Sequence, residues 1–82
     1  MTIHVSADGT IVLTGACPSD DADVLVQHLL ASPGAPVDWR ACETAHSAVI
    51  QVLMAARPRL SGPPAGHPLR EWIEPILTGA SR

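Results

Sequence analysis

The chain has 82 residues and a net charge of −3, a length that suits one domain near the lower limit for a single hydrophobic core. All the cationic side chains are Arg, and they are dispersed rather than gathered in a basic stripe, so nucleic acid is not an expected partner. Phe and Tyr are absent and only Trp39 and Trp72 are aromatic, which excludes a large stacking platform for a ligand and predicts an aliphatic core.

The start of the sequence carries no pattern typical of a targeting segment. Met1 leads directly into a strand-like stretch, and no apolar run reaches the ~18 residues needed to span a bilayer. We therefore expect a cytoplasmic, soluble protein that does not insert into membranes. Cys17 and Cys42 form no CxxC motif, and together with His28 and His46 they lack metal-ligand spacing. Reduced, buried thiols and no metal or other cofactor are expected.

The first third of the chain predicts a β-hairpin followed by a helix. Residues 2–6 and 10–15 are rich in β-branched residues and are joined by an Asp-Gly turn, a strong hairpin signal. The stretch 18–23 then opens a helix, in which Ser19 can cap the first turn and acidic residues lie at the positive end of the helix dipole. The predicted buried stripe of this helix is Ala22, Leu25, Val26, Leu29 and Leu30.

The middle of the chain predicts a crossover between parallel strands. Residues 36–41 read as a short strand between two helices, and such a βαβ unit pairs its strands in parallel. The second helix opens at Ser47 and ends at Arg57, because a proline follows. Residues 59–61 form at most a short, vestigial fourth strand.

The last third predicts one more helix. It starts near Pro68, a favourable first-turn position, and must kink or split at Pro75. Residues 78–82 are expected to form a flexible tail. The predicted apolar face of this helix is Leu69, Trp72, Ile73, Ile76 and Leu77. The whole pattern predicts one α/β domain over residues 1–82, with a mixed sheet of three to four strands and three helices packed mainly on one face.

The helix that opens on Ser47 is the most informative part of the sequence. The first turn of a helix leaves backbone N–H groups unpaired and carries partial positive charge, so a Ser hydroxyl can cap it and an added phosphate is stabilised there. Residues 48–56 are apolar nearly all round, with only Gln51 polar. A helix of this kind is buried on more than one side, and a partner chain or a second subunit can cover the second side. We predict Ile50 and Met54 as exposed partner contacts.

Two segments resemble the STAS family, which contains the bacterial anti-sigma-factor antagonists. Residues 11–15, IVLTG, precede an acidic helix start and resemble the strand and glycine that lead into the first helix of the family. Residues 37–57, VDWRACETAHSAVIQVLMAAR, resemble the family's strand, loop and Leu-rich helix. In the family, Asp, Ser or Thr, Ser or Ala, and Gly precede that helix. The resemblance covers residues 3–57 and implies the STAS fold.

Position by position, the resemblance implies a role for Ser47. This residue falls where family members regulated by phosphorylation have the phosphoacceptor hydroxyl, and Ala48 matches the next small residue. His46 replaces the family Asp, whose negative charge helps to position the kinase chemistry. Val49 replaces the family Gly, and its β-branched side chain blocks a close backbone approach. Helix capping by Ser47 is therefore the favoured interpretation, with phosphorylation as the alternative.

The resemblance implies a non-enzymatic protein-interaction module in bacterial signalling, either an anti-sigma-factor antagonist or a chemotaxis-operon adaptor. Its partner would be an anti-sigma-factor kinase or a chemotaxis component, bound through the loop 43–47 and the helix that follows. The expected partner-binding residues are Glu43, Thr44, His46, Ser47, Ile50, Gln51 and Met54. The alternative is an accessory subunit that binds the ATPase of a lipid-trafficking ABC transporter and needs only the intact Ser47 hydroxyl.

Two further possibilities stay open. An enzyme would need a concave pocket around His46, Ser47 and Cys42. Adjacent residues at a helix start point in different directions, so no catalytic residue is predicted. The short fourth strand could instead let a second copy of the chain complete the sheet edge, which would give a homodimer.

Overall fold

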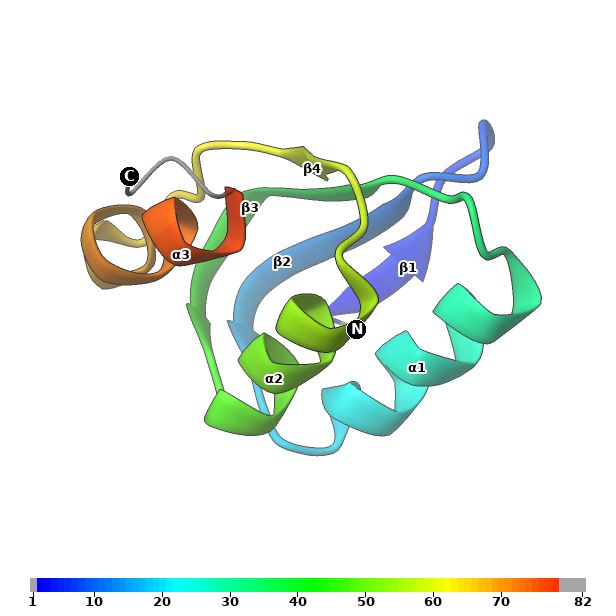
Figure 1. The fold of residues 1–82 in the computed structure, drawn as a ribbon, viewed down its shortest axis with the longest axis horizontal. Coiled ribbons are helices and arrows are strands. Elements are labelled where there is room, and N and C mark those ends of the chain that lie inside the picture. Colours follow the sequence, from blue (N-terminus) through cyan, green and yellow to red (C-terminus); the bar gives the residue numbers. More distant parts are fainter. Residues whose placement is uncertain (1, 79–82) are drawn as a thin grey trace.

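The computed structural model describes residues 2–78 and has the predicted α/β architecture (Figure 1). It is a small α/β domain with a four-stranded mixed sheet and three α-helices. The elements in chain order are β1 (Ile3–Val5), β2 (Ile11–Cys17), α1 (Asp21–Ala31), β3 (Val37–Ala45), α2 (Ser47–Ala56), β4 (Leu60–Ser61), the π-helical segment η1 (Leu69–Ile73) and α3 (Glu74–Thr78). Of the tail predicted at 78–82, residues 79–82 lie outside the described residues.

The sheet follows the chain order β1-β2-β3-β4. Strands β1 and β2 form the predicted antiparallel hairpin, and Gly9 adopts a φ of 90° in its turn, a conformation that glycine reaches without a Cβ clash. Strand β3 pairs in parallel with β2, with Val37 opposite Ile11, and β4 pairs in parallel with β3. The predicted βαβ crossover and the short fourth strand are therefore confirmed.

Strand β3 is longer than the sequence predicts. The expected strand 36–41 begins at Val37 but continues to Ala45. Its pairing with β2 shifts register twice, between Val12 and Thr14 and between Gly15 and Ala16. Such irregularities re-aim side chains along the strand, so the simple alternation that marks a strand in a sequence is lost here. The prediction of a loop from residue 43 onward was wrong for this reason.

Helices α1 and α2 lie side by side on one face of the sheet (Figure 1). In β2 the buried residues Ile11 and Leu13 alternate with Val12 and Thr14, which are half-buried. In β1, His4 is exposed. The buried hydrophobic residues form one cluster, in which Trp39 is fully buried. They are Ile3, Ile11, Leu13, Cys17, Leu25, Val37, Trp39, Cys42, Val49, Leu53 and Leu69.

The start of α1 differs from the prediction that Ser19 caps it. The N-cap position is Asp20, and no side chain caps the helix there. The first turn is held instead by backbone bonds, because the N–H groups of Asp21 and Ala22 donate to the carbonyls of Pro18 and Ser19, both at 3.0 Å. Acidic residues do lie in the first turn, as the dipole favours. One of them, Asp21, is buried and accepts a hydrogen bond from the Thr2 hydroxyl.

The buried face of α1 is narrower than predicted. Leu25 is fully buried, and Ala22 and Leu29 are half-buried against the core. In contrast, Val26 is exposed and Leu30 retains 75% of its accessible surface. Only the side of α1 that carries Leu25 packs fully into the core, and α2 covers only part of the neighbouring side of α1. Val26 and Leu30 therefore stay in solvent.

The last helical region splits, as Pro75 requires. The segment η1 has π-helical bonding, with the Glu74 N–H donating to the carbonyl of Leu69, and Pro75 lies in the first turn of α3. The wider turn changes which side chains meet the core. Leu69 is buried and Ile73 is half-buried, whereas Trp72 is 73% exposed. The predicted single apolar face was therefore wrong at Trp72, and also at Ile76, which is exposed.

None of the helices in residues 2–78 combines the length and the hydropathy that crossing a bilayer requires.

Candidate functional site

The predicted partner-binding residues lie at the end of β3 and along α2. Glu43 and Thr44 belong to the strand and are exposed, and only His46 separates β3 from α2. The backbone N–H of His46 donates to the carbonyl of Cys17 at 2.9 Å, which ties the junction to the end of β2. The predicted loop 43–47 is therefore a tight strand-to-helix junction held by the neighbouring strand.

His46, and not Ser47, caps α2. His46 has the extended backbone of an N-cap residue, with φ of −60° and ψ of 150°, and its Nδ1 accepts a hydrogen bond from the Ala48 N–H at 3.0 Å. Ser47 is the first helical residue. The prediction of Ser47 as the cap was wrong because a neutral imidazole nitrogen can accept the same bond as a hydroxyl, although Ser, Thr, Asp and Asn are the usual capping residues.

One flank of α2 is open to solvent and carries the predicted contact residues. Ser47, Gln51 and Met54 are spaced at helical intervals of four and three and are all exposed, Met54 to 47%. Ile50 lies beside them, half-buried against the core. We call Ser47, Ile50, Gln51 and Met54 the α2 docking stripe. The opposite side of the helix is anchored in the core by Val49 and Leu53.

The hydroxyl of Ser47 is free within the described chain. It lies in the first turn of α2, where the helix carries partial positive charge, and no acidic residue occupies that turn. Because His46 already satisfies the N–H of Ala48, the hydroxyl is not needed to cap the helix. Ser47 can therefore bond a partner or carry a modification without loss of the cap.

The residues considered for an enzymatic site differ in burial, because His46 and Ser47 are exposed and Cys42 is not. Cys42 is fully buried and burial raises its pKa to about 12, so its thiol is not available as a nucleophile. Its Sγ lies 3.9 Å from the Sγ of Cys17, which is also buried and whose pKa burial raises. Both thiols are free, as predicted. No group of three or more potential metal ligands is found among residues 2–78.

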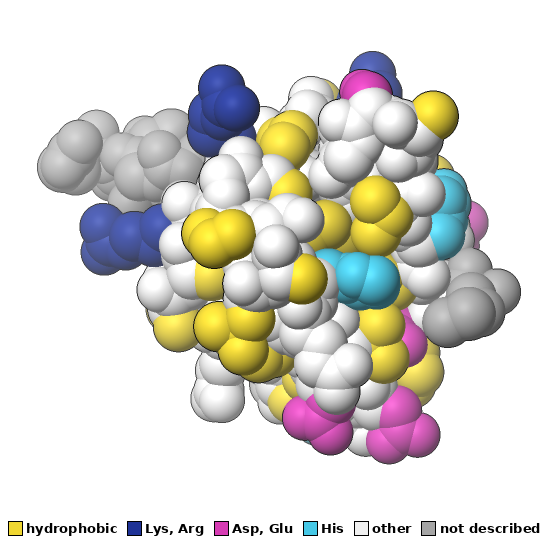
Figure 2. Space-filling model, turned by 90° about the vertical axis from the view of Figure 1, so that its right-hand side faces the viewer, with side chains coloured by type: hydrophobic (Ala, Val, Ile, Leu, Met, Phe, Trp, Pro, Cys, Tyr) yellow, Lys and Arg dark blue, Asp and Glu magenta, His cyan; other side chains and the backbone are white. Residues whose placement is uncertain are grey.

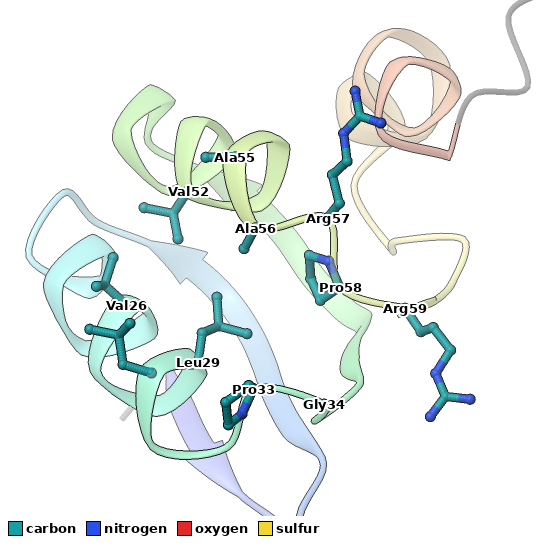
Figure 3. A pocket seen from close by; sticks show the side chains of 11 residues that line it. Val26, Leu29, Pro33, Gly34, Val52, Ala55, Ala56, Arg57, Pro58 and Arg59 are labelled. Atoms are coloured by element: carbon teal, nitrogen blue, oxygen red, sulfur yellow. The ribbon is translucent and has the colours of Figure 1, made fainter.

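A groove lies between α1 and α2 that the sequence did not reveal (Figure 3). Its volume is about 600 Å³, within the usual size range of ligand sites. Its walls are mainly apolar and come from the exposed part of the α1 stripe and from the adjoining flank of α2. The residues that form the two walls are Val26, Leu29, Leu30, Val52, Ala55 and Ala56. The signal was present in the sequence as an apolar stripe wider than one helix can bury, but it was interpreted as core.

The α1–α2 groove and the α2 docking stripe are different surfaces of the same helix. At helical spacing, Val52 and Ala56 face α1, whereas Ser47 and Met54 lie on the flank turned away from it. His46 and Cys42 do not line the groove. Comparisons of the chain with protein-family models, with curated proteins and with solved structures found no match.

Proposed function

We propose that this domain is a STAS-like, non-enzymatic interaction module in bacterial signalling, which docks on a protein partner through α2. The fold agrees with the one that the sequence resemblance implies. An antiparallel hairpin leads into parallel strands, and α1 and α2 lie on the same face of the sheet. A small fold of this kind hosts many functions, so the proposal depends on the surface of α2 and not on the fold.

The observation that carries the proposal is the exposed docking stripe. Met54 and Ile50 offer apolar surface, Gln51 offers an amide, and Ser47 offers an unbonded hydroxyl at the start of the helix. Flexible methionine side chains adapt well to a partner surface. A helix that the core already holds through Val49 and Leu53 is suited to docking, because its backbone need not become ordered on binding.

Phosphorylation of Ser47 would act as a release switch. The free domain tolerates the added charge, since it lies at the positive end of the α2 dipole. In the complex, the phosphate would lie beside the apolar contacts of Ile50 and Met54, where desolvating it is costly. Modification therefore favours the unbound domain. The anti-sigma-factor kinase and the chemotaxis component remain the expected partner classes.

The test is a titration of the domain against purified candidate partners from the same genome, followed by calorimetry. We expect one of the signalling partners to bind, and both Met54→Lys and Ser47→Asp to weaken binding by at least about tenfold, or ~1.4 kcal/mol. Ser47→Ala should bind nearly as well as the parent. Trp72→Lys is the matched control, because Trp72 is a large exposed apolar residue outside the docking stripe. A Ser47→Asp protein that binds as tightly as the parent would refute the switch.

The free hydroxyl of Ser47 also suits the second candidate, an accessory subunit of the ATPase of a lipid-trafficking transporter. In that case the hydroxyl itself forms the contact, without modification. Ser47→Ala should then abolish binding to the ATPase, whereas it should be tolerated by a signalling partner. The same pair of variants therefore separates the two candidates.

A further inference from the structure

The α1–α2 groove leaves large apolar side chains in water on the outer surface of the domain. Figure 3 shows Val26 and Leu29 of α1 opposite Val52 and Ala56 of α2 across the groove. Leu30 stands at its rim and is 75% exposed. An aliphatic side chain gains about 1.5–3 kcal/mol when it passes from full exposure to full burial. Covering this face would therefore stabilise the domain.

The charges around the groove are arranged with opposite signs at its two ends. Helices α1 and α2 run in the same direction, because each connects parallel strands. The amino-terminal end carries the exposed acids Asp20 and Asp23. The carboxy-terminal end carries Arg57 and Arg59, which line the groove. Figure 2 shows acidic side chains at the bottom of the molecule, basic side chains at the upper left and hydrophobic side chains between them, and one acidic and one basic side chain also lie together at the top.

Within residues 2–78 these four charged side chains form no ion pair. Arg40 is engaged by Asp38 in an ion pair of 2.8 Å, whereas Arg57 and Arg59 form no ion pair with any residue of the described chain. The same is true of Asp20 and Asp23. In Figure 3 both guanidinium groups point away from the groove but in different directions, that of Arg57 toward the η1–α3 side and that of Arg59 to the lower right. They are therefore placed to meet acidic groups on another molecule.

We propose that the α1–α2 face binds the same face of a second copy of this chain, with the helices of the two copies antiparallel. A twofold axis through the groove brings the acidic end of each copy against the basic end of the other. Each copy then contributes Asp20 and Asp23 to one side of the interface and Arg57 and Arg59 to the other. The same arrangement buries Val26 and Leu30 of both copies between four helices.

Self-complementarity favours a second copy over other occupants. Asp23, Val26 and Leu30 lie on one side of α1 at helical spacing, so the acid and the apolar contacts face the same neighbour. An anionic membrane or a nucleic acid would meet the basic end but would be repelled by the acidic end. In the antiparallel arrangement the positive end of each helix dipole also lies beside the negative end of a helix dipole in the other copy, which is favourable.

The size of the face predicts a weak dimer. Helices of 10 and 11 residues are only about 15 Å long, so the interface falls below the ~1,600 Å² typical of stable complexes. We expect a dissociation constant in the micromolar range and a dimer that depends on concentration. The proposal does not rest on the docking function of α2, because the docking stripe lies on a different flank of the helix.

Sedimentation equilibrium of charge-reversed variants tests the proposal. The parent chain should dimerise at a protein concentration of about 0.5 mM, which exceeds a micromolar dissociation constant. Arg57→Glu/Arg59→Glu should be monomeric, and so should Asp20→Arg/Asp23→Arg. An equimolar mixture of the two variants should dimerise again, because each supplies the charge that the other has reversed. That recovery also shows that both variants are folded.

A second pair of variants tests the apolar part of the interface. Leu30→Asp should shift the equilibrium to monomer, whereas Trp72→Asp, at an equally exposed position in η1, should leave it unchanged. A parent chain that is monomeric at about 0.5 mM overturns the proposal, and so does a mixture of charge-reversed variants that stays monomeric. A monomeric parent that binds a helical peptide with acidic and leucine side chains would assign the groove to a different partner.

Discussion

The imidazole Nδ1 of His46 accepts a hydrogen bond from the backbone N–H of Ala48 at 3.0 Å, and this pair fixes the first turn of α2. The bond leaves the hydroxyl of the intervening Ser47 available to other molecules. The cap of the helix is thus supplied by His46, and the adjacent Ser47 keeps a hydroxyl that the cap does not use.

Loss of the imidazole should destabilise the domain. His46→Ala removes the acceptor for the Ala48 N–H, and replacement of a capping side chain by Ala typically costs about 1 kcal/mol. Urea denaturation followed by circular dichroism would measure the free energy of unfolding. His46→Asn should recover most of the loss, because Asn is a good capping residue. If Ser47→Ala destabilises the domain more than His46→Ala, then the assignment of the cap is wrong.

Gly66 should not tolerate a side chain. A Cβ at this position would lie 1.6 Å from the carbonyl oxygen of Glu43 in β3, and backbone cannot move aside as a flexible side chain can. We expect Gly66→Ala to destabilise the domain by about 2–4 kcal/mol, measured as the shift of the urea midpoint. Gly34→Ala is the matched control, since a Cβ there meets nothing within 4 Å. Equal effects of the two substitutions would contradict the close approach.

Two leucines of α1 should respond differently to the same truncation. Leu25 is fully buried and Leu30 is 75% exposed. Leu25→Ala leaves a cavity in the core and should cost about 2–5 kcal/mol. Leu30→Ala should change the stability of the monomer by less than about 0.5 kcal/mol. Both free energies of unfolding should be measured at low protein concentration, where self-association does not contribute. A large loss for Leu30→Ala would mean that the flank of α1 is covered within the monomer.

The buried thiols predict a loss of stability at alkaline pH. Burial raises the pKa of Cys17 above its ordinary value of 9.0 and raises the pKa of Cys42 to about 12. At a pH above the ordinary thiol pKa and below the raised pKa, the unfolded chain loses a thiol proton that the folded chain keeps. The unfolded state then binds fewer protons, so Cys42 lowers the free energy of unfolding by up to ~1.4 kcal/mol per pH unit as the pH rises from about 9 to about 12. The raised pKa of Cys17 adds to this decline above pH 9.

Urea midpoints measured across this alkaline range would test the prediction. Cys17→Ala/Cys42→Ala is the control, because it lacks both thiols and should show a shallower decline with pH. A decline as steep as that of the parent would attribute the effect to other groups.

Much of the fold could be predicted because local patterns and tertiary pairing agree. The Asp-Gly turn between β-branched segments predicted the hairpin, and the helices expected on each side of residues 36–41 predicted a parallel strand between them. The end of β3 could not be predicted in this way. Glu43 and Thr44 are polar and exposed. They belong to the strand because Thr44 pairs with Ala16 of β2, while Glu43 lies between the paired residues Cys42 and Thr44.

Exposure along α2 could be predicted only in part, and its capping could not. Met54 is exposed as predicted, whereas Ile50, for which the same was predicted, is half-buried against the core. The periodicity could not show that His46 caps the helix, because capping depends on the direction of a single ring. The periodicity also could not show that Leu25 is buried whereas Leu30 is exposed. Both are apolar at helical spacing, and burial is decided by how far the neighbouring helix reaches.

The outer edge of β3 is finished by a loop instead of a full strand. Strand β4 pairs only with Val37 and Asp38, and farther along the edge Gly66 donates its N–H to the carbonyl of Cys42 at 3.1 Å. The adjoining Pro63 and Pro64 have no N–H to give. An incoming strand would therefore meet occupied acceptors and missing donors on this side, so the domain is protected from open-ended polymerisation by sheet extension at this margin.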